Sequence, residues 1–238
     1  MASTCNNSSS FKIIIRSSSP ARRAILSDMG YEFTSADIDE KAIRREKPEE
    51  LVKALAEAKA DAIQLNLRNR DSRDLPTLLI TSDQVKVSKG MIRERPTSTE
   101  EAREFIKGYS GDVAFAVNYI LVTNLSTGGR KGGWDIPEVT AFPTELANTS
   151  LEFETETHHD FGLFVHLLIY FHHIPDEFIK KVVKEGGMTC VAGGLRLMHP
   201  SSLPFIKELV GTMDSVRGLP KNLTEKLIRE SLQETVEM

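Results

Sequence analysis

The sequence predicts an α/β fold in which a mixed, twisted sheet is flanked by helices. Three observations lead to this prediction. Short apolar runs typical of buried strands alternate with segments of helical periodicity, and residues that begin or end helices stand between them. The chain of 238 residues is also 40% hydrophobic and 27% charged, which is typical of a globular protein with a core.

The first strand and helix of this pattern are clearly marked. Residues 11–15 (FKIII) form a short β-branched run, which a polar turn connects to the helical pattern of residues 21–29. Ser19 is a suitable N-cap, and Pro20 fits the first helical position because an N–H there would have no partner within the helix. Gly30 is well suited to end this helix, because glycine readily adopts the left-handed conformation found after a helix C-terminus. The chain therefore opens with a strand, a polar turn and a helix.

Four further helices follow from the same signals. They are predicted to begin at Pro48, at residues 97–99, at Pro175 and after Pro220. In the first of these, apolar residues recur at helical spacing from Leu51 to Ala62, and Lys59 lies within it.

Two strand regions complete the pattern. Residues 78–80 are a buried type of strand that ends at Asp83, where an acid at a strand's carboxyl end is well placed for ligand binding. Residues 113–123 are predicted to turn at Gly128 and to form a β-hairpin that continues towards Trp134.

We predict one domain over residues 11–238, preceded by a tail without fixed structure at residues 1–10. Residues 140–169 interrupt what would otherwise be a continuous strand from Val139 into Tyr170. We therefore predict that this segment is an insertion that loops out from the sheet.

Charge and composition exclude several classes of protein. The chain has 30 Lys and Arg against 34 Asp and Glu, a net charge of −4, which argues against a nucleic-acid coat protein. The longest apolar stretch, residues 161–171, is broken by His166 and is too short to span a bilayer. Cys5 and Cys190 cannot build a disulfide framework, and residues 1–10 lack the pattern of a secretory signal. We expect a cytoplasmic protein without nucleic-acid or membrane partners.

The strongest functional pattern is a serine-rich turn followed by two arginines at a predicted helix N-terminus. Free N–H groups and the positive end of the helix dipole favour an anion there. Ser17, Ser18 and Ser19 offer hydroxyl donors, and Arg22 and Arg23 offer charge and forked hydrogen bonds. The pattern suits a phosphate chain, although a capped surface helix with two solvated arginines would show it too.

Four other charged residues support the phosphate interpretation. Glu40 and Asp83 are carboxylates that could bind Mg²⁺, and Lys59 and Arg95 are further cations. Hydrolysis of a phosphoanhydride requires that developing charge be neutralised and that a water be deprotonated. Taken separately, Glu40, Lys59 and Arg95 are each more typical of a solvated surface than of a site.

Several spaced motifs together resemble the Maf family of nucleoside triphosphate pyrophosphatases. They are SSSPARRAIL, SADIDE ending at Glu40, LAEAKA containing Lys59, TSDQV containing Asp83, Arg95-Pro96, YSG at 109–111, VAGG at 191–194 and GLP at 218–220. The resemblance extends from residue 11 to about residue 232, apart from residues 140–169. It implies a Maf/ITPase-like fold with a cleft between two lobes.

The resemblance also implies an activity and a role for each matching residue. The activity is hydrolysis of a nucleoside triphosphate between the α- and β-phosphates, with Mg²⁺ or Mn²⁺, as a house-cleaning enzyme that acts as a homodimer. Asp83 would be the catalytic acid, as general base or metal ligand, and Glu40 would assist the metal or the water. The phosphates would be held by Ser17, Arg22, Lys59 and Arg95.

Three positions bear on the substrate subgroup. Arg22 and Arg23 after Ala21 fit the spacing of the 7-methyl-GTP type, and so does Gln84 after the catalytic acid, where the dTTP/UTP type has threonine. Met198 stands where the family has Gln or Glu and matches neither type. The 7-methyl-GTP type is therefore favoured, and the dTTP/UTP type is the alternative.

Two other functions remain open at this point. Arg16, Ala21, Met198 and the segment 140–169 depart from the family pattern, which would also suit a nucleotide-binding protein without catalysis. The apolar residues 161–171 would suit a structural protein that docks a partner.

Overall fold

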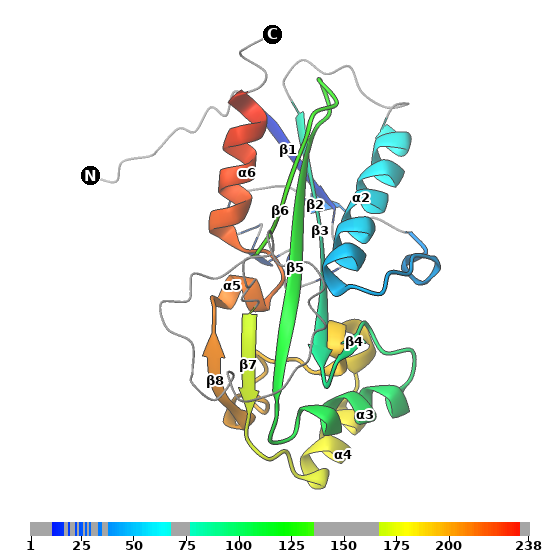
Figure 1. Ribbon diagram of the computed structural model, residues 1–238, viewed down its shortest axis with the longest axis vertical. Coiled ribbons are helices and arrows are strands. Elements are labelled where there is room, and N and C mark those ends of the chain that lie inside the picture. Colours follow the sequence, from blue (N-terminus) through cyan, green and yellow to red (C-terminus); the bar gives the residue numbers. More distant parts are fainter. Residues whose placement is uncertain are drawn as a thin grey trace, which may run out of the picture.

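The computed structural model describes residues 11–16, 19, 22, 24, 25, 27, 29, 33–34, 38–67, 77–135 and 167–233. These residues form an eight-stranded mixed sheet with helices on both faces, which confirms the predicted fold class (Figure 1). None of the helices in these ranges is long and apolar enough to cross a membrane.

Two long antiparallel strands form the centre of the sheet. β3 (Thr77–Ser88) and β5 (Val113–Asn124) are paired from Leu78 opposite Asn124 to Val87 opposite Phe115. Both strands run along most of the length of the molecule (Figure 1). The other strands are therefore arranged around one continuous ladder.

The shorter strands extend the sheet in the order β2-β1-β3-β5-β7-β8, with β4 paired to β3 and β6 paired to β5. β1 runs parallel to β2 and β3, and the remaining pairs are antiparallel. Their bounds are β1 (Lys12–Arg16), β2 (Phe33–Thr34), β4 (Met91–Arg93), β6 (Arg130–Trp134), β7 (Leu167–Phe171) and β8 (Ile206–Val210).

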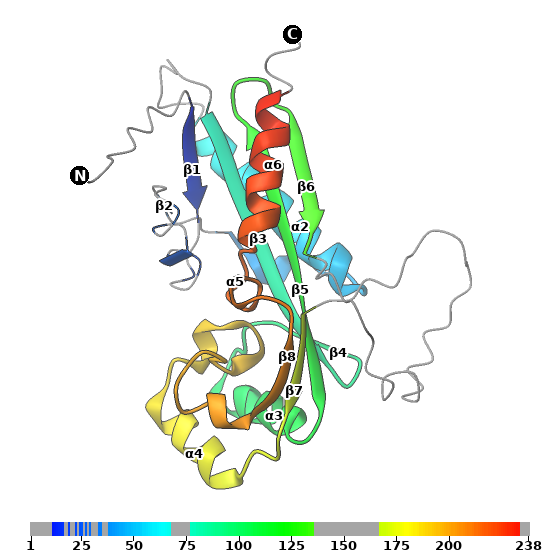
Figure 2. The same cartoon turned by 90° about the vertical axis from the view of Figure 1, so that its left-hand side faces the viewer.

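The first lobe of the molecule is the part in which two helices enclose the sheet. α2 (Pro48–Leu67) covers one face, and α6 (Lys221–Gln233) covers the other (Figure 2). Strand alternation divides the apolar residues between these helices, because successive side chains point to opposite faces. Leu79 packs in the α2 cluster, whereas Leu78 packs in the α6 cluster.

The second lobe is built on the other end of the same strands. α3 (Thr99–Tyr109) and α4 (Asp176–Glu185) pack against β5 and β7 in a separate core that contains Ile106, Ile169 and Ile179. This lobe also holds three short 3₁₀ segments, η3 (Met188–Cys190), η4 (Ala192–Gly194) and η5 (Leu203–Phe205). α5 (Met213–Val216) leads the chain back to α6 in the first lobe (Figure 2).

Several boundaries predicted from the sequence are confirmed. The Ser98 side chain caps α3 by accepting a hydrogen bond from the N–H of Glu101, and Pro175 is the N-cap residue of α4. The predicted hairpin exists as the antiparallel pair of β5 and β6, in which Tyr119 lies opposite Trp134. Local signals therefore located most elements.

The predicted end of the strand at Asp83 is wrong. β3 continues past Asp83 to Ser88, so the carboxylate lies in the middle of a strand. β1 pairs only with Thr77–Ile80, so the edge of β3 is no longer covered by β1 from Thr81 onwards. The polar residues Thr81, Ser82 and Asp83 lie at this uncovered edge. Pairing with β5 continues without interruption on the other side of β3.

The predicted boundary of the insertion also differs from the structure. β7 begins at Leu167, three residues before the predicted return to strand at Tyr170, and Leu167 and Ile169 are buried in the second lobe. These residues pair with Ala116 and Ala114 of β5, so they belong to the sheet. Residues 1–10 and residues 140–166 lie outside the described residues.

This placement of β7 can be tested with one core substitution. Ile169→Ala should lower the free energy of unfolding by about 2–5 kcal/mol, because it leaves a cavity under α3. Leu203→Ala is the matched control, since Leu203 is 47% exposed and should change stability by less than ~0.5 kcal/mol. Denaturation followed by circular dichroism would measure both, and equal stability of the two variants would contradict the placement.

Candidate active site

A gap along one edge of β3 marks the site. β1 pairs with Thr77–Ile80 and β4 with Lys86–Ser88, whereas residues 81–85 pair only with β5 within the described part of the chain. A cavity of about 470 Å³ opens at this gap, and residues from both lobes line it. The gap therefore exposes both faces of β3 to one cavity.

Lys59 of α2 joins the two predicted carboxylates. Its Nζ lies 2.8 Å from Oε1 of Glu40 and 3.3 Å from Oδ2 of Asp83. The side chains of Lys59 and Asp83 are 9% and 12% exposed, so these ion pairs are largely shielded from water. The lysine itself lies behind the two carboxylates, which both line the cavity.

Local structure positions each member of this group. The hydroxyl of Thr81 donates to the carbonyl oxygen of Ala56 at 2.9 Å and so fastens β3 to α2. Asp83 is two residues further along the same face of β3, which places it against Lys59 one turn further along α2. Glu40 begins η1 (Glu40–Ala42), which Asp39 caps by accepting from the N–H of Lys41.

The ion pair with Lys59 decides the charge state of Glu40. Burial alone would raise the pKa of the Glu40 carboxyl. The attraction and the hydrogen bond of Lys59 outweigh burial, with help from Arg95 and Arg22, so that the pKa of Glu40 is lowered. Glu40 therefore enters the site as a carboxylate near neutral pH.

Arg22 occupies the gap itself. Its Nη1 donates to the carbonyl oxygen of Ser82 at 3.1 Å, a backbone group that β1 would otherwise cover. Its Nε donates to the carbonyl oxygen of Gly218 at 3.0 Å, and its Nη2 lies 3.9 Å from Oδ1 of Asp83. Burial lowers the pKa of Arg22, and the nearby Asp83 carboxylate opposes that change. Arg22 thus holds β3, the loop before α6 and Asp83 together.

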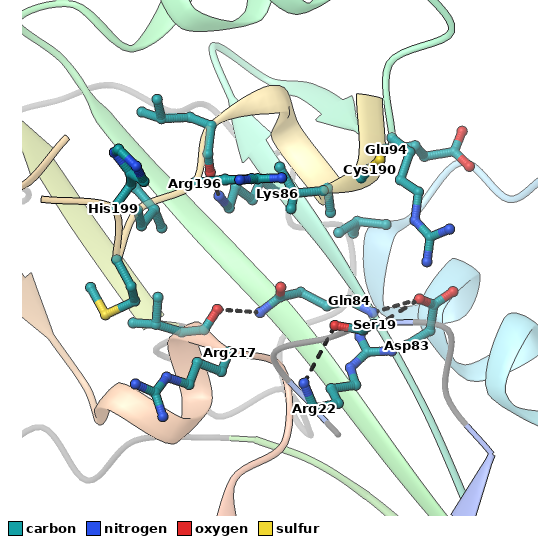
Figure 3. Close-up of a pocket in the computed structure, with 18 of the residues that line it drawn as sticks. Ser19, Arg22, Asp83, Gln84, Lys86, Glu94, Cys190, Arg196, His199 and Arg217 are labelled. Atoms are coloured by element: carbon teal, nitrogen blue, oxygen red, sulfur yellow. Dashed lines mark hydrogen bonds and ion pairs between the residues drawn. The ribbon is translucent and has the colours of Figure 1, made fainter. Parts of the chain in front are cut away.

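The helix start predicted before Arg22 agrees with the structure. The N–H of Arg22 donates to Oγ of Ser19 at 3.4 Å (Figure 3). The described residues Arg22, Ala24, Ile25 and Ser27 are helical. Ser19 and Arg22 both line the cavity, so the capping contact between them lies at its edge, where a helix N-terminus favours an anion.

A second group of charges follows β4 on the opposite rim. Arg95 is half-buried and lines the cavity next to Glu94. Nζ of Lys41 donates to the carbonyl oxygen of Arg95 at 3.3 Å and lies 3.8 Å from Glu94, which Arg44 also approaches at 3.7 Å. These contacts connect the segment of η1 to that of β4.

Gln84 points away from Asp83, because neighbouring residues of a strand face opposite sides. Its Nε2 donates to the carbonyl oxygens of Ser215 at 3.1 Å and Val216 at 3.4 Å. Both donor hydrogens of the amide thus face α5, and Figure 3 shows the Gln84 side chain crossing the cavity towards this segment. The carboxamide is fixed in orientation.

Most of the predicted site residues come together. The structure places Ser19, Arg22, Glu40, Asp83, Gln84 and Arg95 around one cavity, with Lys59 behind it. Ser17, Ser18 and Arg23 lie outside the described residues.

Six cavity residues with charged or ionisable side chains were missed by the sequence analysis. They are Lys41, Lys86, Glu94, Arg196, His199 and Arg217. The alternation Val85-Lys86-Val87 is typical of a strand with one solvated face, which gave no reason to single out the lysine. The others lie in segments without a recognisable pattern.

The described residues contain no group of three or more His, Cys, Asp or Glu side chains that could hold a metal. Two carboxylates, Glu40 and Asp83, nevertheless line the cavity and are held close to the same lysine, Lys59. This donor set fits Mg²⁺, which commonly takes one or two carboxylates and completes its shell with water and substrate phosphates.

A family model described as Maf-like protein matches residues 12–231. The chain belongs to the Maf-like family. A 7-methyl-GTP pyrophosphatase from Dictyostelium discoideum is 35% identical over 224 residues, covering 93% of this chain and 98% of the relative. The family resemblance found in the sequence is thereby confirmed.

Two more distant matches were also found. A dTTP/UTP pyrophosphatase from Alkaliphilus metalliredigens is 26% identical over 211 residues, 88% of this chain and 90% of that protein. The Maf-like chain is thus more similar to the 7-methyl-GTP pyrophosphatase. A solved nucleoside-triphosphatase / dITP/XTP pyrophosphatase from Mycobacterium abscessus covers 55% of this chain at 13% identity, with a TM-score of 0.27, too low to support a conclusion.

The role of Lys59 predicts a pH-dependent loss of stability. In Lys59→Met, Glu40 and Asp83 lose their shared cation, and the pKa of Glu40 should rise because only the weaker attraction of Arg95 and Arg22 still opposes burial. In wild type, the pKa of Glu40 is lower in the folded state than its value near 4.5 in the unfolded chain. The Glu40 carboxylate therefore stabilises the fold at any pH above 4.5, and this stabilisation is lost as the pH falls through the pKa of the folded state. The variant should therefore be about 1.5–3 kcal/mol less stable than wild type near pH 7, and the difference should shrink near pH 4.

Chemical denaturation at both pH values would measure this difference. Lys53→Met is the control on the same helix, since Nζ of Lys53 lies over the Trp134 ring, 5.9 Å from its centroid. A stability difference of the same size at both pH values would contradict the proposed linkage.

Proposed function

We propose that this Maf-like protein is a nucleoside triphosphate pyrophosphatase that hydrolyses the α-β phosphoanhydride and releases a nucleoside monophosphate and pyrophosphate. The observation that carries this proposal is the pair of carboxylates, Glu40 and Asp83, which share Lys59 at a cavity flanked by Arg22. The family and the activities named for its relatives support the proposal.

The cations of the site suit a triphosphate. Arg22, Ser19 and Arg95 all line the cavity, and Arg95 is close enough to lower the pKa of both Arg22 and Glu40. Together they would hold the phosphates and neutralise the negative charge that grows on the leaving pyrophosphate. The side chains of Ser17, Ser18 and Arg23 belong to the same proposed cradle.

Asp83 is the proposed base. Its carboxylate lines the cavity between Arg22 and Lys59, and Oδ1 also accepts the N–H of Gln84 at 2.8 Å. These contacts fix its position, so that a water on the cavity side can be aligned for in-line attack on the phosphate. Glu40, which contacts the same lysine, would assist the metal or the water.

We propose Mg²⁺ or Mn²⁺ as cofactor, held by Asp83 and Glu40 together with substrate phosphates. When bound, such a cation neutralises phosphate charge and acts as a Lewis acid. Lys59 would keep both carboxylates in place for it.

The substrate is proposed to be 7-methyl-GTP or a similar modified nucleotide, with dTTP and UTP as the alternative. Gln84 supports the first type, whereas Met198 matches neither. Pyrophosphate release from a panel of methylated and standard triphosphates would decide between them. A preference for dTTP and UTP over 7-methyl-GTP would overturn the first choice.

The setting of the enzyme is proposed from composition and family resemblance. The net charge of −4 gives no reason to expect a nucleic-acid partner, and the two cysteines suit a reducing compartment, so we propose a cytoplasmic house-cleaning enzyme. We propose a homodimer as its assembly, which sedimentation equilibrium would test.

Met198 favours one second candidate, a nucleotide-binding protein without catalysis. This apolar side chain lines the cavity at a position where the family has Gln or Glu. Isothermal titration with triphosphates, compared with a turnover assay, separates the two functions. Binding without hydrolysis by the wild-type protein would favour the second candidate.

Asp83→Asn should abolish pyrophosphate release, with a loss of about 10²–10⁴-fold in kcat, because the amide cannot accept a proton from water. The matched control is Asp61→Asn on the exposed side of α2, where Asp61 pairs with Arg130 outside the cavity. Thermal melting would check that both variants fold. Undiminished turnover in Asp83→Asn would refute the assignment.

The metal proposal makes a separate prediction. Chelation with EDTA should stop turnover of the wild-type enzyme, and added Mg²⁺ or Mn²⁺ should restore it. Glu40→Gln should raise the metal concentration required for half-maximal rate by roughly tenfold, because one anionic ligand is lost. Glu230→Gln on α6 is the control, since Glu230 lies beside Lys226 on the surface. Full activity in EDTA would contradict the metal requirement.

A further inference from the structure

Lys86 is a buried lysine on the face of β3 opposite to Asp83. Strand alternation places it on the same face as Gln84, and it lines the same cavity at only 4% exposure. Its Nζ donates to the carbonyl oxygen of Leu195 at 3.3 Å. An ammonium has three donors and a neutral amine two, so at least one donor remains for another partner.

A glycine makes room for this side chain. Gly193 in η4 has φ of +74°, and a Cβ there would lie 2.6 Å from Cδ and 3.2 Å from Cβ of Lys86. The stem of the lysine thus runs closely past the backbone of η4. This packing fixes where its amine lies, so Lys86 is not a mobile surface residue.

The described residues provide no carboxylate for Lys86. It forms no ion pair there, and burial lowers the pKa of its amine to about 7. A buried amine without a counter-charge destabilises a fold. Such a group in a cavity is well suited to a partner that arrives with the ligand.

The surroundings of Lys86 suit a flat ring. The cavity near it has apolar walls formed by Leu195, Leu197, Met198 and Val216. In Figure 3, Asp83 and Glu94 lie at the other end of the cavity from His199 and Arg217, with Lys86 and Arg196 between. An apolar slot with a few fixed polar groups is the usual form of a site for a ring-shaped ligand.

We propose that Lys86 is a specificity-determining residue that donates a hydrogen bond to a carbonyl oxygen of the nucleotide base. This inference rests on the proposed function, since it places the triphosphate at Asp83 and the base beyond Gln84. A base with an oxygen at the position facing Lys86, such as uracil or hypoxanthine, accepts this bond. Cytosine and adenine carry an amino group there, which leaves the buried donors unpaired.

Two pairs of nucleotides test the inference, because each pair differs only in one exocyclic group of the base and in the proton on the ring nitrogen beside it. UTP and CTP differ in oxygen against amino group, and so do ITP and ATP. We expect the wild-type enzyme to favour UTP and ITP in kcat/KM, and Lys86→Met to reduce each preference roughly tenfold. Lys207→Met is the matched control, since Lys207 is an exposed strand lysine outside the cavity.

A stability measurement accompanies the assay. Lys86→Met keeps the length of the side chain and removes an unpaired buried charge, so its melting temperature should equal or exceed that of wild type. If this variant fails to fold, Lys86→Gln replaces it. Its amide can both donate and accept, and it should therefore also reduce the discrimination.

Other outcomes overturn the inference. If Lys86→Met loses kcat/KM equally for all four nucleotides, Lys86 acts on the ribose or the phosphates that they share. If the variant keeps the wild-type preferences for UTP over CTP and for ITP over ATP at undiminished kcat/KM, the role of Lys86 is purely structural. If the wild-type protein releases no pyrophosphate from any of the four, the proposed function fails. The ratios of dissociation constants from isothermal titration with the same nucleotides then still test Lys86, and equal ratios in wild type and variant overturn its role.

Discussion

The antiparallel pairing of β3 with β5 is the constraint on which the rest of the structure depends. This ladder runs without a break from Leu78 opposite Asn124 to Val87 opposite Phe115, and each lobe packs its own core against one part of it. The two lobes are therefore joined by continuous strands, not by a flexible linker. The pairing of β3 with β5 therefore sets how the two lobes face each other across the cavity.

The interrupted edge of β3 turns this rigid ladder into a site. Where β1 has ended and β4 has not begun, the backbone of β3 offers carbonyl groups that only side chains can satisfy, and Arg22 does so at Ser82. The same guanidinium approaches Asp83, so one residue covers the edge and faces the catalytic carboxylate. Burying a charged group is favourable only when it is paired with an opposite charge or a hydrogen-bond partner. Each charge of the site therefore stabilises its neighbours in the buried position, through the contacts that join Arg22, Asp83, Lys59 and Glu40.

Much of this arrangement could be predicted from the sequence, and the exceptions have physical reasons. Helix caps such as Ser98 and the hairpin into Trp134 depend on local chemistry, so they were found correctly. The strand end at Asp83 was misplaced because polar residues inside a strand resemble a turn until the missing edge neighbour is known. The start of β7 was misplaced because Leu167–Ile169 continue an apolar run, and only pairing with β5 assigns them to the sheet. Asp83, Glu40 and Lys59 were first singled out as charged partners for a phosphate, and the family motifs then gave each of them a role; periodicity alone would leave each of them on a solvated surface.

Strand geometry also explains how one short segment can serve both chemistry and recognition. Asp83 faces α2 and its lysine, and Gln84 and Lys86 face the opposite side, towards α5 and η4. The alternation of a strand separates these two environments within four residues. On the α2 side, the carboxylate has two cations beside it; on the other, the amine of Lys86 has no carboxylate among the described residues. A ligand that spans the edge of β3 meets both environments, so its phosphate and ring portions can be selected independently. Changes on one face of the strand can therefore alter recognition while the reacting groups on the other face stay in place.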